Sequence, residues 1–236
     1  MRDLYDIHCH ILPGVDDGAK DMDMALSMIE KEIDAGVETI ILTPHFRKEM
    51  FEPDMEDIWS AYDTLVDETR NRNIRLYLGS EFHMEMVETL DRDFRPTLAD
   101  SRYVLTEFSS SSTRAFIKER ADALLTAGYY PIIAHIERYR ALRKDFVFIA
   151  DLIEMGCERQ VNADAVIGRN GLGAQRFCKK LMQEDMLHYV ASDAHNLRGR
   201  ASHMEECCEY LKKHMGRLYT SRIMRDNPSK IVETLR

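Results

Sequence analysis

The chain has 236 residues, of which 44% are hydrophobic, and this is enough to bury the core of one domain. Its formal net charge of -9 disfavours a nucleic-acid partner, because nonspecific binding depends on phosphate neutralisation by lysine and arginine. We find no signal-peptide pattern and no apolar run long enough to cross a bilayer. We therefore expect a cytoplasmic protein without membrane insertion, built as a single domain over residues 1–236.

Five cysteines are present, an odd number, and no two of them form a Cys-x-x-Cys pair. This pattern argues against a disulfide framework and against a zinc ribbon. Reduced thiols are expected at all five positions, which are Cys9, Cys157, Cys178, Cys207 and Cys208.

Apolar, β-branched runs alternate with helix-like stretches along the whole chain. We predict strands near Leu4, Thr39, Arg75, Tyr103, Pro131, Arg159 and His188, and helices over 21–35, 54–72, 113–127, 145–155 and 171–183. The first helix stops at Gly36, where a left-handed cap residue is expected. Asn227-Pro228 is a helix start, with the apolar residues Ile231, Val232 and Leu235 expected to pack on the barrel. This alternation predicts a parallel α/β sheet, and seven strands predict a distorted (β/α)7 TIM-like barrel.

The segment DIHCHILPGVDDGA, residues 6–19, carries the strongest chemical signal. Residues two apart on a strand point to the same face, so His8 and His10 can hold one metal ion, and Asp17 follows on the next loop. Two exposed histidines in a polar loop would be the simpler interpretation of this pair alone.

The same arrangement recurs, because further apolar runs end in a residue able to bind a cation. Together these positions give nine candidate ligands: His8, His10, Asp17, His45, Glu81, Glu107, His135, Asp193 and His195. One zinc ion takes about four ligands, so several ions must share them. A bridging carboxylate such as Glu81 would hold two ions close together, and such sites hydrolyse phosphate esters. Mixed imidazole and carboxylate ligands suit zinc, manganese or iron.

Residues 109–112 form a serine run directly after a predicted strand. The run has two interpretations, a mobile loop or a loop that approaches a substrate phosphate, and the sequence leaves both open.

The opening motif, the strand ends at His45 and His135, and the segment SDAHN at 192–196 resemble the polymerase and histidinol phosphatase (PHP) superfamily. Within it, ILTPHF, LGSEF, VLTEF, AHIER and SDAHNLRGR are similar to the bacterial manganese-dependent tyrosine phosphatases of capsule and exopolysaccharide clusters. The resemblance runs from about Asp6 to the helix after Arg200. It departs from the family at Cys9 and at Phe46-Arg47-Lys48. We expect the second departure, which follows His45, to affect the rim of the site and substrate preference.

The resemblance implies two to three divalent ions, with manganese favoured and zinc or iron as alternatives. The first ion would be held by His8, His10, Glu81 and Asp193; the second by Glu81, Glu107 and His135; the third by Asp17, His45 and His195. Arg138 and Arg200 fall where such phosphatases bind the substrate phosphate, and Arg198 competes for the second of these roles.

The resulting hypothesis is hydrolysis of phosphotyrosine by a metal-activated hydroxide, with Arg138 and Arg200 on the phosphate oxygens. His45 or His195 would supply a proton if the third ion is absent. A cysteine mechanism requires His-Cys, five residues and then arginine, whereas Val15 stands at the arginine position after Cys9. The thiol mechanism is therefore disfavoured.

Three alternatives remain open at this point. They are a histidinol phosphatase or other small-molecule phosphoesterase of the same superfamily, a DNA-processing nuclease, and a non-catalytic metal-bound scaffold that binds a kinase. A nuclease is expected to have a basic groove or a polymerase domain, and the acidic charge and the missing domains count against it. The resemblance alone implies that the substrate is the tyrosine-rich tail of a bacterial autophosphorylating kinase controlling polysaccharide export.

Overall fold

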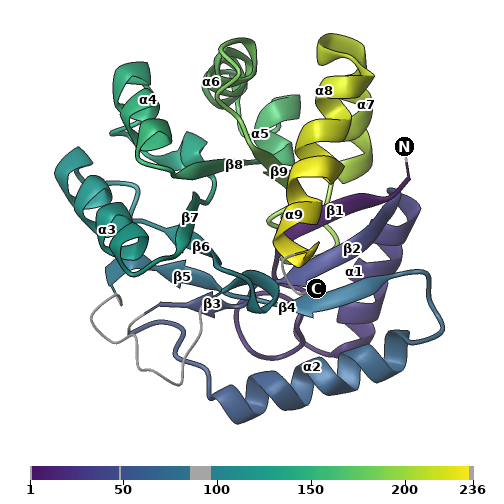
Figure 1. The fold of residues 1–236 in the computed structure, drawn as a ribbon. Coiled ribbons are helices and arrows are strands. Elements are labelled where there is room, and N and C mark those ends of the chain that lie inside the picture. Colours follow the sequence, from purple (N-terminus) through teal and green to yellow (C-terminus); the bar gives the residue numbers. More distant parts are fainter. Residues whose placement is uncertain (1, 48, 86–96, 234–236) are drawn as a thin grey trace.

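Helices and parallel strands alternate along the chain in the computed structural model, which describes residues 2–47, 49–85 and 97–233 (Figure 1). The strands are β1 (Leu4–Cys9), β2 (Val37–Leu42), β3 (His45–Phe46), β4 (Arg75–Leu78), β5 (Glu81–His83), β6 (Tyr103–Glu107), β7 (Tyr130–Ile133), β8 (Glu158–Asn162) and β9 (Tyr189–Ala191). Every pairing between these strands is parallel. The predicted α/β class and its parallel sheet are confirmed.

The helices lie around the outside of the sheet (Figure 1). The α-helices are α1 (Met22–Asp34), α2 (Met55–Thr69), α3 (Arg114–Thr126), α4 (Phe146–Glu154), α5 (Ala163–Ile167), α6 (Leu172–Gln183), α7 (Met204–Met215), α8 (Arg217–Ser221) and α9 (Asn227–Glu233). Shorter helical turns are η2 (Leu98–Asp100), η3 (Ile136–Arg138) and η4 (Arg222–Asp226). The predicted helices match α1, α2, α3, α4 and α6 to within a few residues, and the short α5 has no counterpart in the prediction.

Local side-chain chemistry explains where several helices begin and end. The carboxylates of Asp21, Asp54 and Asp145 accept hydrogen bonds from first-turn backbone N–H groups of α1, α2 and α4, which are otherwise unpaired. Gly36, which follows α1, has a φ of +87°, in the left-handed region that glycine enters without steric cost. The left-handed residue expected at Gly36 is confirmed.

Two of the seven predicted strands are interrupted. The strand order is β1-β2-β4 in one sheet and β3-β5-β6-β7-β8-β9 in the other. Along the chain, two residues separate the end of β2 from the start of β3, and two residues separate the end of β4 from the start of β5, so each of these two predicted strands is divided between the two sheets. Pro44 lies in the first interruption, and a proline has no N–H to give to the ladder. Hydrogen bonds from Gly79 N to Leu42 O (2.8 Å) and from Glu81 N to Pro44 O (3.0 Å) join the two sheets across the break.

The sheet curls until its last strand reaches its first (Figure 1). His10 N donates to Ala194 O at 2.9 Å, and Asp193 N donates to His8 O at 2.8 Å. The buried carboxylate of Asp6 accepts from both the backbone N–H and the hydroxyl of Ser192, 186 positions away. The ends of β1 and β9 are therefore side by side, as a closed barrel requires.

The C-terminal segment packs on the barrel, as predicted. Ile231 on α9 is fully buried in a cluster that includes Tyr5 and Ile7 of β1, and Val232 packs against the same cluster. Leu235 lies outside the described residues. Among the described residues, no helix combines the length and the apolar character needed to span a membrane.

Candidate metal centre

The nine predicted ligands lie near the carboxyl ends of long strands, at the first residues of the short strands β3 and β5 that continue β2 and β4, or on the loops that follow strands. His8 lies on β1, His45 begins β3, Glu81 begins β5 and Glu107 ends β6. His10, Asp17, His135, Asp193 and His195 lie on the loops after β1, β7 and β9. Parallel strands of a barrel point their carboxyl ends toward one face, so residues from most of the chain meet there.

His8, His10, Glu81 and Asp193 form the first group. The Nε2 atoms of His8 and His10 are 3.4 Å apart, and each lies 3.3 Å from Oε2 of Glu81. Each also lies 3.6 Å from Oδ1 of Asp193. The two imidazoles therefore converge on the same carboxylates, although His10 lies one residue beyond the end of β1.

Glu81 also belongs to a second group through its other oxygen. Oε1 of Glu81 lies 2.7 Å from Nε2 of His135, which is 4.0 Å from Oε1 of Glu107. Nδ1 of His45 lies 3.0 Å from Oε2 of Glu81 and 4.0 Å from Oε2 of Glu107. The two oxygens of one carboxylate thus face different sets of imidazoles, the geometry of a bridging ligand.

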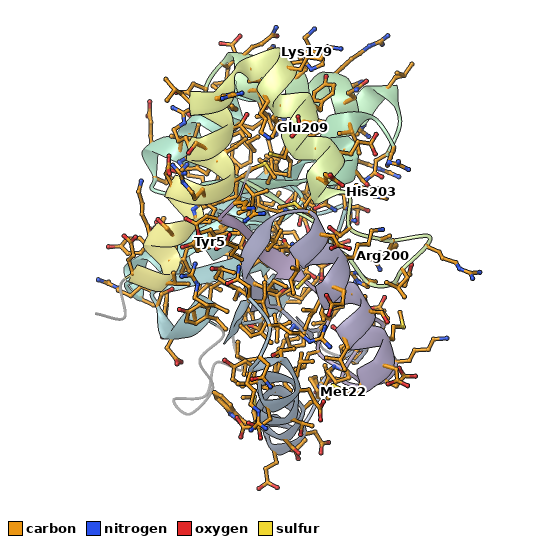
Figure 2. The ribbon with its side chains drawn as sticks, turned by 90° about the vertical axis from the view of Figure 1, so that its right-hand side faces the viewer. Tyr5, Met22, Lys179, Arg200, His203 and Glu209 are labelled. Atoms are coloured by element: carbon orange, nitrogen blue, oxygen red, sulfur yellow. The ribbon has the colours of Figure 1, made fainter. Side chains whose placement is uncertain are left out.

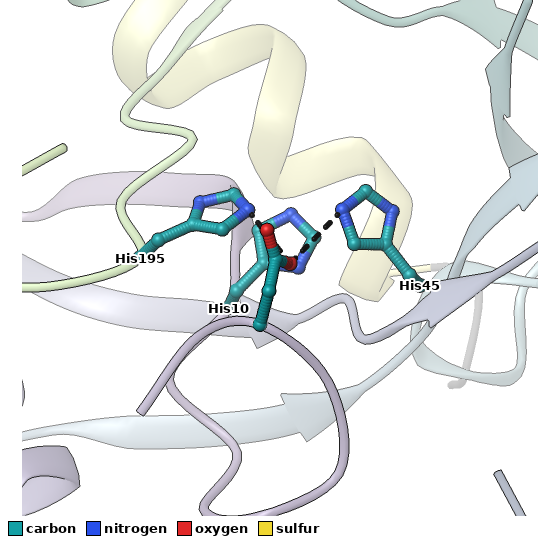
Figure 3. Close-up of side chains that lie close together, drawn as sticks. His10, His45 and His195 are labelled. Atoms are coloured by element: carbon teal, nitrogen blue, oxygen red, sulfur yellow. Dashed lines mark ion pairs between the residues drawn. The ribbon is translucent and has the colours of Figure 1, made fainter. Parts of the chain in front are cut away.

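Asp17 is at the centre of the third group. Figure 3 shows His10, His45 and His195 around a single carboxylate. Oδ1 of Asp17 lies 3.5 Å from Nε2 of His45 and 3.4 Å from Nε2 of His195. The ring centroids of His10 and His195 are 3.8 Å apart. The same four residues have ligand atoms within 4.8 Å of one another, so His10 adjoins this group as well as the first.

The polar atoms at the centre fit a set of cations. Within the described residues, Glu81 Oε2, Glu107 Oε2, His45 Nδ1 and His195 Nε2 are buried and have no hydrogen-bond partner. A buried polar atom without a partner costs free energy, and coordination to a divalent ion would remove that cost. The donor set, imidazole nitrogen with carboxylate oxygen, suits manganese, zinc and iron.

Burial and neighbouring charges shift the ionisation of several of these groups. Burial, followed by the charge of Glu81, raises the pKa of Glu107 to about 7. Burial, followed by the charge of Arg138, lowers the pKa of His135 to about 4, and burial followed by the charge of His10 lowers the pKa of His195 to about 2. His135 and His195 are therefore neutral at pH 7, the form in which imidazole binds a metal ion.

The backbone is strained at two of the predicted ligands. His135 has a φ of +31° and Asp193 a φ of +52°, in the left-handed region that residues with a Cβ rarely adopt. Such conformations persist where surrounding contacts hold them, and they are frequent at functional sites. Asp193 N bonds His8 O, and His135 N donates to Gln160 Oε1 at 2.7 Å, which supplies those contacts.

Several polar residues that the sequence analysis did not select support the ligands. Asp16 Oδ2 lies 2.7 Å from His10 Nδ1, and Tyr139 OH lies 3.2 Å from His135 Nδ1. On β8, Gln160 Oε1 lies 3.2 Å from His8 Nδ1, and Asn162 Nδ2 donates to Asp193 Oδ2 at 2.7 Å. The only sequence signal for the last two was their spacing, since Gln160 and Asn162 are two residues apart on one predicted strand.

Gly18 explains how the loop carrying Asp16 and Asp17 folds back on β1. Ala19 N donates to His10 O at 2.9 Å, and a Cβ added at Gly18 would lie 2.0 Å from the same oxygen. Only glycine allows this close approach of two backbones. Asp16 then reaches His10, and Asp17 reaches His45 and His195.

The two predicted phosphate-binding arginines both contact the centre. Arg138 Nη2 lies 2.5 Å from Asp193 Oδ2. Arg200 places Nη2 3.3 Å from Asp193 Oδ1 and Nη1 3.3 Å from Asp17 Oδ2. In Figure 2, Arg200 is seen between His203 and Met22, on the loop that precedes α7. In the described part of the chain, the side chain of Arg198 makes no ion pair or hydrogen bond; the geometry therefore favours Arg200 over Arg198.

A recess of about 230 Å³ opens beside the centre. Its lining residues are Arg47, Glu107, Phe108, Ser109, Ser110, His135, Arg138 and Tyr139. It includes Arg47, from the segment expected to form the rim, and two serines of the 109–112 run. This position is compatible with a loop that approaches a substrate phosphate.

All five cysteines are free and buried, as expected for reduced thiols. Burial, followed by the charge of Asp6, raises the pKa of the Cys9 thiol well above its usual range. A nucleophilic cysteine needs the opposite shift, because the thiolate is the reactive form. Cys9 is thus a buried thiol whose raised pKa disfavours the reactive thiolate.

Comparisons with known proteins find relatives that cover nearly the whole chain. The family model described as capsular polysaccharide synthesis, CpsB/CapC, matches residues 4–233. The tyrosine-protein phosphatase CpsB of Streptococcus pneumoniae is 35% identical, with 97% of this chain and 98% of that protein covered. The tyrosine-protein phosphatase YwqE of Bacillus subtilis is 32% identical, with 90% and 85% covered.

A solved structure of the same kind of protein superposes closely. It is described among the crystal structures of YwqE from B. subtilis and CpsB from S. pneumoniae, unique metal-dependent tyrosine phosphatases. The TM-score is 0.89 at 29% identity, covering 98% of this chain and 95% of that one. A phosphotriesterase homology protein from Escherichia coli, at 13% identity and a TM-score of 0.62, shares the fold alone.

Proposed function

The chain belongs to the capsular polysaccharide synthesis CpsB/CapC family, and on this premise we propose that it is a metal-dependent protein-tyrosine phosphatase. The proposal treats residues 1–236 as one phosphatase domain. The observation that carries it is the position of Glu81, because its two carboxylate oxygens face different imidazoles. Beside it, Arg138 and Arg200 both form ion pairs with Asp193. This arrangement suits a phosphate ester held against several cations.

We propose two to three divalent ions, with manganese as the physiological metal. His8, His10, Glu81 and Asp193 would hold the first; Glu81, Glu107 and His135 the second; Asp17, His45 and His195 the third. His10 also lies within reach of the third group, and His45 within reach of Glu81 and Glu107. When bound, such ions neutralise phosphate oxygens and lower the pKa of water. The fit of the buried, unpartnered oxygen and nitrogen atoms described above supports this assignment.

The chain's own residues would position the substrate and the proton. Arg138 and Arg200 would exchange part of their contact with Asp193 for the phosphate oxygens, which guanidinium groups bind bidentately. The leaving tyrosinate has a conjugate-acid pKa of about 10, so it needs less proton assistance than an alkyl oxide. Where the third ion is absent, His45 or His195 is the proposed proton donor.

The proposed protein substrate is the phosphorylated tail of a bacterial tyrosine kinase that regulates capsule or exopolysaccharide synthesis. The family description and the names of the relatives support a phosphotyrosine protein of this kind. The cytoplasmic location inferred from the sequence stays a prediction.

A panel of substrates tests the function. With manganese added, we expect turnover of a tyrosine phosphopeptide, and much slower turnover of histidinol phosphate and single-stranded DNA. Elemental analysis would accompany each assay, and Glu81→Gln should lose both metal and activity. A preference for histidinol phosphate would contradict the proposal in favour of a small-molecule phosphatase. Full metal content with no turnover of any phosphate ester would favour a non-catalytic scaffold.

A further inference from the structure

A second depression lies on the other side of the loop that joins β7 to α4. Its volume is about 470 Å³, and its lining residues are Arg140, Arg143, Lys144, Gly173 and Phe177. Arg138 and Tyr139 of the same loop line the recess beside the metal centre. The loop therefore separates the two hollows, and Arg140 N donates to Ser110 O (3.3 Å) across the wall of the first.

The charges of this second depression are not neutralised within the described part of the protein. Arg140, Arg143 and Lys144 are exposed, and their side chains make no ion pair or hydrogen bond there. The chain as a whole has a net charge of -9. The three cationic side chains around this hollow therefore form a positive patch on a protein that is negative overall. A local field of this kind attracts an anionic group.

The floor of the depression is apolar, and one side of it is the backbone of Gly173, which has no side chain. Phe177 on α6 packs against Phe146 of α4, with ring centroids 5.5 Å apart, and the two helices lie side by side in Figure 1. A Cβ added at Gly173 would lie 3.1 Å from Nη2 of Arg143, so this guanidinium lies over the first turn of α6. The hollow thus combines an aromatic floor with a cationic rim.

We infer that this depression binds a second phosphotyrosine of the same substrate chain, while the first reacts at the metal centre. The inference rests on the proposed phosphatase function. A phosphate monoester carries a charge of about -2 and is bound bidentately by guanidinium, whereas a carboxylate carries one charge. The phenyl ring of phosphotyrosine would pack against the apolar floor.

The spacing of the two hollows limits the spacing of the two tyrosines. Arg138 and Arg140 are two residues apart, so their Cα atoms are at most about 7 Å apart. An extended peptide advances about 3.4 Å per residue, so test peptides with phosphotyrosines two to five residues apart span about 7 to 17 Å and sample the distances between two adjoining hollows. Substrates with clustered tyrosines would therefore be preferred.

The test compares peptides with the manganese-loaded enzyme. One peptide carries a single phosphotyrosine, and others carry a second phosphotyrosine, tyrosine or glutamate two to five residues away. We expect the doubly phosphorylated peptide to have a kcat/KM per reacting tyrosine about tenfold higher, the size of one or two charge-assisted hydrogen bonds. The combined variant Arg140→Ala, Arg143→Ala, Lys144→Ala should abolish this preference and leave p-nitrophenyl phosphate turnover unchanged.

A matched variant controls for the loss of three positive charges. Arg70, Lys213 and Arg217 are exposed cations on other parts of the surface, and replacing all three by alanine should preserve the preference. The inference is overturned if the two triple variants behave alike, if the glutamate peptide is preferred equally, or if single-stranded DNA of equal charge competes as well as the phosphopeptide.

A binding measurement separates failure of the inference from failure of the proposed function. The probe is a peptide with two non-hydrolysable difluorophosphonate analogues of phosphotyrosine, followed by fluorescence anisotropy. Absence of turnover of every phosphotyrosine substrate would defeat the proposed function alone. An equal Kd for wild type and the Arg140/Arg143/Lys144 variant would defeat the docking site, whatever the activity.

Discussion

Oδ2 of Asp16 lies 2.7 Å from Nδ1 of His10, and the same oxygen accepts a hydrogen bond from His45 N at 3.0 Å. One carboxylate, itself not among the predicted ligands, therefore orients two histidines of the proposed metal centre. Although burial opposes it, His10 holds the pKa of Asp16 well below its usual range, so Asp16 stays ionised. Such outer contacts determine ring orientation and ligand basicity.

Asp16→Asn should weaken manganese binding by about 10- to 100-fold, because the amide replaces a charged acceptor of the His10 ring. Titration of the metal-free protein with manganese measures this change. Asp23→Asn, at an exposed position on α1, is the matched control and should bind as wild type does. Equal affinities for the two variants would show that Asp16 does not orient a ligand.

Arg200→Ala should lower turnover of aryl phosphates by about a hundredfold while metal content stays full, because a donor to the phosphate is removed. Arg198→Ala should change turnover little, since its side chain makes no contact with the centre in the described residues. Kinetics with elemental analysis of both variants check this assignment. The reverse result would give the phosphate-binding role to Arg198.

Removal of metal by a chelator should abolish activity, and manganese should restore it. Cys9→Ala should keep its turnover number, because the buried thiol lacks the low pKa of a nucleophile. We expect this variant to lose only about 1 kcal/mol of stability from the smaller side chain. Activity that survives exhaustive chelation, or that disappears with Cys9, would revive a thiol mechanism.

Glu32→Gln should stabilise the protein above neutral pH. Glu32 on α1 is fully buried, and burial together with the nearby Asp6 raises its pKa well above the ordinary value of 4.5. The folded state therefore binds a proton that the unfolded state releases above about pH 4.5. The contribution of Glu32 to the free energy of unfolding is therefore fully present below about pH 4.5. It is lost as the pH rises through the pKa that Glu32 has in the folded protein.

Urea unfolding of Glu32→Gln and wild type at equal metal concentration measures this effect. The difference in unfolding free energy should be small near pH 4.5 and reach about 1 kcal/mol or more at pH 8. Asp34→Asn, at an exposed position of the same helix, should show no such trend. A difference independent of pH would mean that Glu32 is ionised in the folded state.

Much of the fold could be predicted because its signals are local. Alternating apolar runs located the seven strand positions, and Asp21, Gly36 and Asn227-Pro228 marked helix ends through their own backbone chemistry. The two strand interruptions were not predicted. They depend on how Leu42 pairs with Gly79 and Pro44 with Glu81 across neighbouring strands, and no window of consecutive residues contains those pairings.

The sequence by itself determined which residue types follow the strand ends, because strand and loop positions depend on neighbours along the chain. Only the tertiary structure decided which side chains share a partner. Curling of the sheet brings β9 against β1 and thereby places Asp193 beside His8 and His10, and Gln160 behind His8 and His135. The basic depression beside α6 arises in the same way, since Arg143 on the loop before α4 and Gly173 in the first turn of α6 meet only when these two segments are packed together.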